Sequence, residues 1–341
     1  TKPTIMKQDN QIVEYNLTAS EFNWEIKTGK VITAWGFNHQ VPGPELKAKK
    51  GDTLVVHVQN NLPEPTMVHW HGIRLPASMD GTGEVQHPIL PGESFEYRFI
   101  VPDAGTFWYH SHQNETVQME RGMYGGIVIE EATDPKFDDE KVLVLDDMQL
   151  NAKNEFTQHG VVGRWIERHD GREGSTNLIN GKEELQLQMH AGQVERWRLI
   201  NAASARYFKL SLDGKPFKVI ATDGGLLEEA RTETELLITP GERFDIVVGP
   251  FEEGEVFAIQ SLPYNRVTML KAKNQRYATV QVNEKKPSIA VLSSKLTEIA
   301  LLAPQDAPVT RRVTLSVDPG LKHIIDFRVN TKMHGMDEPV M

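Results

Sequence analysis

The stretch Pro91-Gly92-Glu93-Ser94-Phe95-Glu96-Tyr97-Arg98-Phe99 decides the fold class of this 341-residue chain. It opens with a Pro-Gly turn and continues with aromatic residues that alternate with charged ones. Because successive side chains of a strand point to opposite faces, this period of two predicts a half-buried β-strand. Pro240-Gly241-Glu242-Arg243-Phe244 closely matches the first five residues, 149 positions later, which indicates an internal repeat.

Further strand-like runs extend this pattern along the chain. β-branched and apolar runs occupy residues 53–58, 126–129, 142–145 and 244–248, and turn formers such as Asp80-Gly81 separate the runs. Convincing helical periodicity is scarce. Many short strands with regular turns predict an all-β protein made of β-sandwiches or barrels.

The repeat also predicts the domain organisation. Asn38 and Asn180 begin matching segments 142 residues apart, and a third opening at residues 327–330 ends 150 residues after Asn180. Units of this length suit one sandwich domain each. We predict three segments: a first domain at 1–135, a second domain at 136–290, and a linker with the start of a truncated third domain at 291–341. The alternative is a two-domain protein with an ordinary tail.

Composition excludes several classes of function. The chain has no cysteine, so disulfides, zinc-thiolate sites and thiol catalysis are ruled out. The formal net charge of -10 disfavours nucleic acid and anionic membranes as partners. No apolar run reaches the length of about 18 residues that a transmembrane helix needs. Thr1-Lys2-Pro3-Thr4 is not a signal peptide, although it could be a mature end.

Two His-X-His pairs are the candidate metal site. His69-Trp70-His71-Gly72 and His110-Ser111-His112 each place two imidazoles two residues apart. Residues i and i+2 of a strand share a face, so two neighbouring strands could bring four imidazoles together. Neutral imidazoles suit copper, zinc, iron or nickel. The alternative is that each histidine is an isolated surface or core residue.

These motifs resemble domain 1 of the multicopper oxidases. The resemblance lies in His69-Trp70-His71-Gly72, in Gly105-Thr106-Phe107-Trp108-Tyr109-His110-Ser111-His112 and in Gly122-Met123-Tyr124-Gly125. Phe37–Pro44 also looks like the entry motif of the family, although His39 stands where the family more often has Gly. The resemblance implies tandem cupredoxin-like domains, each a Greek-key β-sandwich. The second domain, with no histidine near Arg206–Ser211, would be a spacer without copper ligands.

The resemblance also implies a role for each residue. His69 would bind the type 2 copper, His71 and His110 would bind one type 3 copper, and His112 would bind the other. Asp80 matches an acidic position that assists proton delivery to this trinuclear cluster. It is equally well explained as a simple turn residue before Gly81.

The implied function is that of a laccase-like oxidoreductase. Such an enzyme takes single electrons from a phenol, a diphenol, an aromatic amine or a metal ion and passes four electrons to O2, giving water. The type 1 copper needs a cysteine, so we expect that copper and four further histidines in a missing third domain, and we expect this chain to be inactive alone.

Two other functions compete with this one. A copper-binding or structural cupredoxin protein without oxidase activity is the main alternative. Copper nitrite reductase is disfavoured because its type 1 site also needs cysteine. The family resemblance alone implies a periplasmic or secreted location.

Overall fold

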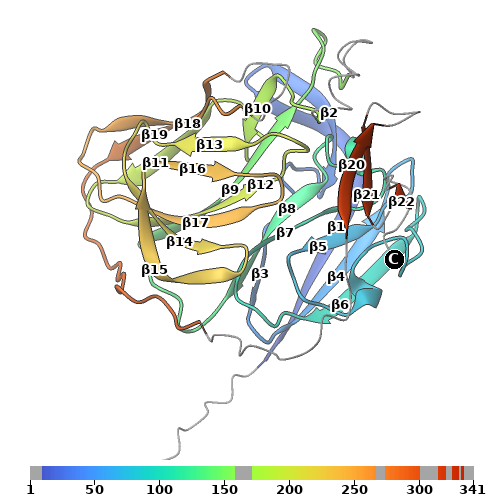
Figure 1. The fold of residues 1–341 in the computed structure, drawn as a ribbon, viewed down its shortest axis with the longest axis horizontal. Coiled ribbons are helices and arrows are strands. Elements are labelled where there is room, and N and C mark those ends of the chain that lie inside the picture. The colour runs from blue at the N-terminus through green and yellow to red at the C-terminus, as the bar shows by residue number, and fades with distance from the viewer. Residues whose placement is uncertain are drawn as a thin grey trace, which may run out of the picture.

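The computed structural model describes residues 10–157, 171–265, 273–299 and 314, together with the backbone of three strands between 315 and 333. Almost all of its regular structure is β (Figure 1), which confirms the predicted fold class. Two short helices occur among the described residues, η1 (Ala77–Met79) and α1 (Glu115–Gln118). With three and four residues, neither is long enough to cross a membrane.

The N-terminal strands form a sandwich of two four-stranded sheets, which we call the first sandwich. Its outer sheet has the order β2-β1-β4-β6, and its inner sheet has the order β3-β8-β7-β5. The outer strands are β1 (Ile12–Lys27), β2 (Lys30–Phe37), β4 (Thr53–Asn60) and β6 (Ser94–Ile100). The inner strands are β3 (Leu46–Lys49), β5 (Val68–His71), β7 (Gly105–Ser111) and β8 (Tyr124–Glu130). The chain passes repeatedly between the sheets, as in a Greek key.

The sequence pattern explains how the first sandwich closes. Tyr97 and Phe99 of β6 are buried, whereas Glu96 and Arg98 between them are exposed, as the alternation predicts. The two buried rings contact Trp70 of β5, each with its centroid 5.2 Å from that of Trp70. Burying one large aromatic side chain stabilises the folded state by on the order of 1.5–3 kcal/mol. The middle residue of His69-Trp70-His71 therefore anchors β5 in the core.

A second, larger sandwich follows. Its sheets have the orders β10-β9-β12-β17-β14-β15 and β11-β19-β18-β13-β16. The six-stranded sheet contains β9 (Asp139–Met148), β10 (Thr176–Ile179), β12 (Glu195–Asn201), β14 (Phe217–Thr222), β15 (Gly225–Glu233) and β17 (Arg243–Val248). The five-stranded sheet contains β11 (Leu185–His190), β13 (Phe208–Ser211), β16 (Glu235–Ile238), β18 (Val256–Leu262) and β19 (Gln275–Asn283). These sheets enclose a core that includes Trp197, Phe208 and Tyr277.

The internal repeat has a structural counterpart in both sandwiches. Asn38 and Asn180 both have positive φ, 56° and 50°. Each side chain accepts a hydrogen bond from one backbone amide and donates one to a backbone carbonyl, at 2.7–2.9 Å. A second pair repeats in the same way at the ends of β4 and β12. The side chain of Asn60 donates to the Ile89 carbonyl, and that of Asn201 donates to the Ile238 carbonyl. Each of these side chains also accepts a hydrogen bond from the backbone amide two residues later.

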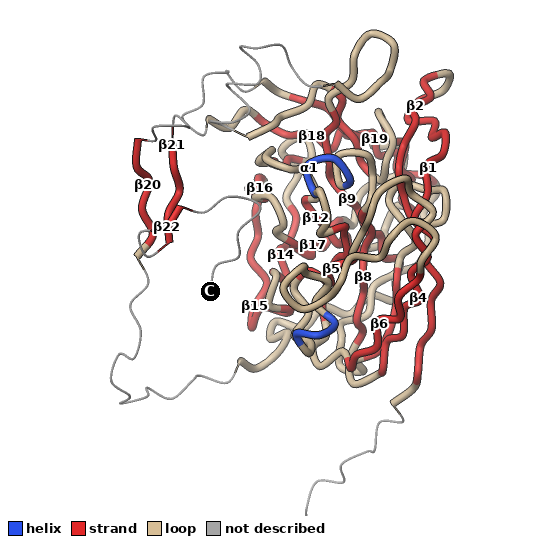
Figure 2. The backbone as a smooth tube through the Cα atoms, turned by 90° about the vertical axis from the view of Figure 1, so that its right-hand side faces the viewer, coloured by secondary structure: helices blue, strands red, loops and turns tan. Residues whose placement is uncertain are grey.

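The inner sheet of the first sandwich packs on the second sandwich. Figure 2 shows β5 and β8 between the strands β1 and β4 on one side and β12 and β17 on the other. An apolar cluster crosses this interface and includes Trp108 and Tyr124 from the first sandwich, with Val144 and Ile200 from the second. Consequently the face of β7 that points away from the core of the first sandwich is also shielded from solvent.

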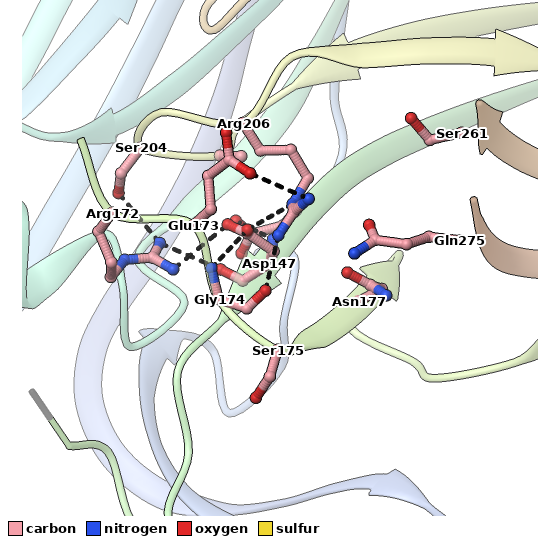
Figure 3. Close-up of polar contacts among 12 residues, drawn as sticks. Asp147, Arg172, Glu173, Gly174, Ser175, Asn177, Ser204, Arg206, Ser261 and Gln275 are labelled. Atoms are coloured by element: carbon pink, nitrogen blue, oxygen red, sulfur yellow. Dashed lines mark hydrogen bonds and ion pairs between the residues drawn. The ribbon is translucent and has the colours of Figure 1, made fainter. Parts of the chain in front are cut away.

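A buried ionic network fixes one end of the interface. Asp147 of β9 accepts hydrogen bonds from Arg206 Nε at 2.6 Å and Gly174 N at 2.7 Å, and Arg172 Nη1 lies 3.3 Å from it (Figure 3). Arg172 also pairs with Glu120, which follows α1 in the first sandwich. The loop before β10 is therefore fastened to both sandwiches.

Residues 291–341 are described only in part. β20 (Leu315–Pro319), β21 (Ile325–Val329) and β22 (Lys332–Met333) form a small antiparallel sheet. Asn330 and residues 334–341 lie outside the described residues. The predicted start of a third domain, like the other domain boundaries, stays a prediction.

Candidate metal centre

The two His-X-His pairs lie on adjacent strands. β5 and β7 pair antiparallel, with His69 opposite His110 and His71 opposite Trp108. Trp70 and Ser111, the middle residues of the two motifs, are fully buried on the other face. The strand alternation therefore turns His69, His71 and His110 towards one space, as the spacing predicts.

Four imidazole rings gather there. The ring centroid of His69 lies 5.7 Å from that of His71, 5.3 Å from that of His110 and 5.4 Å from that of His112. One nitrogen from each of His69, His71 and His110 lies within 4.8 Å of the other two. The structure thus brings all four predicted histidines together, with a nitrogen of three of them in one small space.

Hydrogen bonds select the nitrogen that each ring presents. His110 Nδ1 lies 2.8 Å from the Ser111 carbonyl oxygen, which can only accept, so Nδ1 carries the proton and Nε2 keeps its lone pair. Nε2 of His110 lies 3.3 Å from Nδ1 of His71. Two nitrogens that each lie about 2 Å from one metal ion are roughly 3 Å apart, so this pair has the separation of two ligands.

His69 is oriented by the loop after η1. Its Nδ1 donates to the Asp80 carbonyl oxygen at 2.8 Å, and a carboxylate oxygen of Asp80 lies 3.3 Å from the same nitrogen. A partner of this kind fixes the tautomer of a metal-binding histidine. His69 Nε2 is then the nitrogen with a free lone pair, directed away from the loop.

Gly81 lets this loop reach His69. Its φ is +73°, and a Cβ atom there would lie 1.8 Å from the Val68 carbonyl oxygen, far inside van der Waals contact. Only glycine permits so close an approach of two backbones. The sequence reasoning considered the carboxylate of Asp80 and missed its backbone carbonyl, since a backbone contact leaves no trace in residue type.

The surroundings of His71 and His110 favour the neutral form of both rings. Burial lowers the pKa of His71 to about 4, and the Arg243 guanidinium acts in the same direction. Burial also lowers the pKa of His110 to about 3. Both rings are therefore neutral at neutral pH, the form in which imidazole binds metal ions.

His112 differs from the other three. Its side chain is 38% exposed, and its Nε2 lies 3.1 Å from a Glu115 carboxylate oxygen in α1. Sequence reasoning missed Glu115, although its i,i+3 spacing from His112 was a usable signal. It also missed Trp108, whose ring centroid lies 4.4 Å from that of His110 and 4.9 Å from that of His71.

Comparison with known proteins places the chain in a family. Two family profiles, both described as multicopper oxidase, match residues 18–134 and residues 107–286. The chain belongs to the multicopper oxidase family. The family implies copper, and the neutral imidazoles of His71 and His110 suit copper.

Individual members of the family agree with this assignment. Multicopper oxidase MmcO of Mycobacterium tuberculosis is 32% identical in an alignment of 275 residues that covers 72% of this chain and 53% of MmcO. The chain therefore spans about half the length of that relative. The crystal structure of a multicopper oxidase from Pseudomonas thermotolerans is 34% identical, with a TM-score of 0.76, and the match covers 86% of this chain and 69% of that one.

A second solved structure adds a description of activity. The multicopper oxidase from Campylobacter jejuni, described as a metallo-oxidase, is 27% identical with a TM-score of 0.79. The match covers 98% of this chain and 72% of that chain. These multicopper oxidase structures have the same cupredoxin-like fold, which supports the prediction made from the motifs.

Proposed function

We propose that this chain carries half of the oxygen-reducing copper cluster of a laccase-like multicopper oxidase. The whole enzyme would couple one-electron oxidation of its donor to four-electron reduction of O2 to water. The observation that carries the proposal is the pair of ring nitrogens, His71 Nδ1 and His110 Nε2, 3.3 Å apart on neighbouring strands. Two neutral imidazoles, His110 buried and His71 partly buried, with nitrogens at this distance are suited to share one ion.

Each side chain has a separate role in this proposal. His69 holds the type 2 copper through Nε2, His71 and His110 share one type 3 copper, and His112 holds the other. When bound, copper would supply one-electron redox chemistry, which imidazole supports in both oxidation states. Asp80, partly exposed and 3.3 Å from His69 Nδ1, would exchange protons with solvent beside the cluster.

The remaining ligands would come from outside these 341 residues. A type 1 copper site needs a cysteine, and the sequence has none. We propose domains at 1–135 and 136–290, with 291–341 leading into a third that supplies the type 1 site and four more histidines. Without them, the chain alone would bind copper but would not turn over an organic donor.

The donor is a phenol, a diphenol, an aromatic amine or a metal ion. Support for a metal ion is the Campylobacter jejuni relative, which is described as a metallo-oxidase. Support for a periplasmic or secreted location is family resemblance. Oxygen consumption by the full-length enzyme, with copper(I) and a diphenol offered in turn, distinguishes the donor classes.

The alternative is a copper-binding or structural cupredoxin protein without oxidase activity. The absence of cysteine favours it, whereas the complete set of four histidines favours the oxidase. The source gene separates the two. His-Pro-X-His-X-His and His-Cys-His motifs in the same reading frame would support the oxidase, and a stop codon directly after Met341 would support the alternative.

Copper binding by the chain tests the site itself. Under anaerobic conditions, we expect the chain to compete with a colorimetric chelator for copper(I), and we expect His110→Ala to weaken binding at least tenfold. His57→Ala is the matched control, because His57 lies in the first sandwich but pairs with Glu96 on the surface. Failure of the wild-type chain to bind copper would overturn the proposal.

A further inference from the structure

The face of β7 that carries His110 continues into the contact with the second sandwich. Thr106, Trp108 and His110 are spaced by two residues, so their side chains leave the strand on the same side. All three are at least 94% buried. The histidine cluster and the interface between the sandwiches therefore share one strand face.

Charged residues of the second sandwich hold the start of this face. The Thr106 hydroxyl donates to Asp245 Oδ1 at 2.6 Å and accepts from Arg198 Nη1 at 2.9 Å. Asp245 also binds Arg196 through Oδ2 at 2.5 Å. Asp245, Arg196 and Arg198 are each 1% exposed, so the network is shielded from water.

Arg243 extends the contact to the residue after His71. Its Nε donates to the Thr106 carbonyl oxygen at 3.2 Å. Its guanidinium lies so close to Gly72 that a Cβ atom there would be 2.3 Å from Nη2. Gly241 lies against the His71 ring, since a Cβ atom on it would be 3.2 Å from Cε1. One turn of the second sandwich thus contacts both histidine strands.

A buried ionic network of this kind fixes the positions of its side chains more than it stabilises the folded state. Removing ions from water has a large desolvation cost, and the attraction between the ions offsets that cost only when the geometry is good. Although burial acts the other way, Arg196 and Arg198 keep the pKa of the Asp245 carboxyl below its usual range. The ionised carboxylate therefore has few arrangements open to it, and it holds Thr106 in one of them.

We propose that Asp245, Arg198 and Arg243 are positioning residues for the histidine cluster. They act through Thr106 and Gly72, and they fix β7 relative to β5 so that His71 and His110 face each other. The second sandwich then contributes to the metal centre without supplying a ligand. The inference rests on the proposed copper site.

A strand rises about 3.3 Å per residue, so Thr106 lies roughly 13 Å from His110. The backbone ladder of β7 with β8 runs without interruption from Gly105 to His110. Because the segment between Thr106 and His110 is one extended strand without a bulge, a shift of Thr106 along the strand also shifts His110. The distance between His71 Nδ1 and His110 Nε2 is the quantity that such a displacement changes.

Thr106→Val tests the proposal, because valine has nearly the shape of threonine and lacks the hydroxyl. We expect the copper(I) affinity of the full chain to fall about tenfold and the electron paramagnetic resonance spectrum of its copper(II) form to change. Thr106→Ser restores the hydroxyl and should restore both. Asp245→Asn should resemble Thr106→Val.

The control is an ion pair of the same interface that does not contact β7. Arg206→Lys weakens the pairing with Asp147, so it should lower the melting temperature without changing copper affinity or the spectrum. The inference fails if Thr106→Val stays folded and keeps wild-type affinity and spectrum. It also fails if Arg206→Lys changes both to the same extent. If wild-type chain binds no copper, the proposed function fails instead.

Discussion

Each sandwich contains an equivalent pair of neighbouring strands, but only the pair in the first sandwich carries histidines. In the first, β5 pairs with β7 and His69 faces His110. In the second, β13 pairs antiparallel with β18, and Lys209 faces Leu262. Lys209 pairs with Glu235 of β16 on the edge of its sheet. The fold supplies a strand pair in both places, and a few side chains on one face decide whether it offers metal ligands.

The surroundings of the strand pair differ as well. The first sandwich adds a loop whose backbone carbonyl orients His69, and the second sandwich places the Gly241 turn against the His71 ring. The histidines are thus embedded in contacts that the residue pattern of β5 and β7 does not contain. Each of the following predictions tests one part of this difference.

The largest expected effect is a loss of stability of the metal-free chain at acidic pH. Unfolded histidine has a pKa near 6.5, whereas the folded values are about 4 for His71 and about 3 for His110. Below pH 6.5 the unfolded chain binds protons that the folded chain does not, so stability is complete above pH 6.5 and falls with pH. Between pH 6.5 and pH 4 we expect a loss of about 3 kcal/mol for each residue, at 1.36 kcal/mol per pKa unit.

Urea unfolding at a series of pH values measures this loss. The control is the double variant His71→Leu with His110→Leu, whose free energy of unfolding should change much less over the same range. Equal slopes for the two proteins would show that other groups cause the acid sensitivity.

The next largest effect is the loss of copper. His71→Ala combined with His110→Ala removes the two facing nitrogens, so we expect copper(I) affinity to fall at least a thousandfold, about 4 kcal/mol. Competition with a colorimetric chelator gives the affinity. A fall of less than tenfold would mean that copper binds elsewhere in the chain.

Gly81→Ala tests the loop that orients His69. The new Cβ atom cannot fit 1.8 Å from the Val68 carbonyl oxygen, so the loop must move and we expect about 2 kcal/mol of lost stability. Copper affinity should fall as well. Gly83→Ala is the control, since nothing lies within 4 Å of its Cβ position. Equal behaviour of the two variants would contradict the role of the loop.

The smallest effect is expected from transplanting the motif. Lys209→His with Ser211→His places a His-X-His pair on β13. In the background of His71→Ala and His110→Ala, this pair should raise copper affinity less than tenfold, which is about 1.4 kcal/mol. The reason is that β18 offers no histidines and that no loop orients the new rings. A hundredfold gain would show that two imidazoles on one strand are enough.

The sequence predicted the parts of the molecule that follow from local periodicity. Phe95–Phe99 forms part of β6, and the spacing within His69–His71 and His110–His112 correctly placed four imidazoles together. These patterns depend only on the two-residue period of a strand. The family motifs then allowed the fold to be named before any contact was known.

Other features were not predictable because they depend on contacts between distant residues. Arg243 donates to Thr106, 137 residues away in the chain. The partner of His69 is a backbone carbonyl, which every residue type possesses. Patterns along the sequence do not report which surfaces of two sandwiches meet, so the positioning network was visible only in the structure.

The apolar cluster across the interface limits how the chain can be divided. Trp108 and Tyr124 of the first sandwich are each no more than 3% exposed because the second sandwich covers them. A shortened gene product ending after β8 would leave both rings in contact with solvent. Such a product is expected to self-associate during expression, so biochemical work on the histidines should use both sandwiches together.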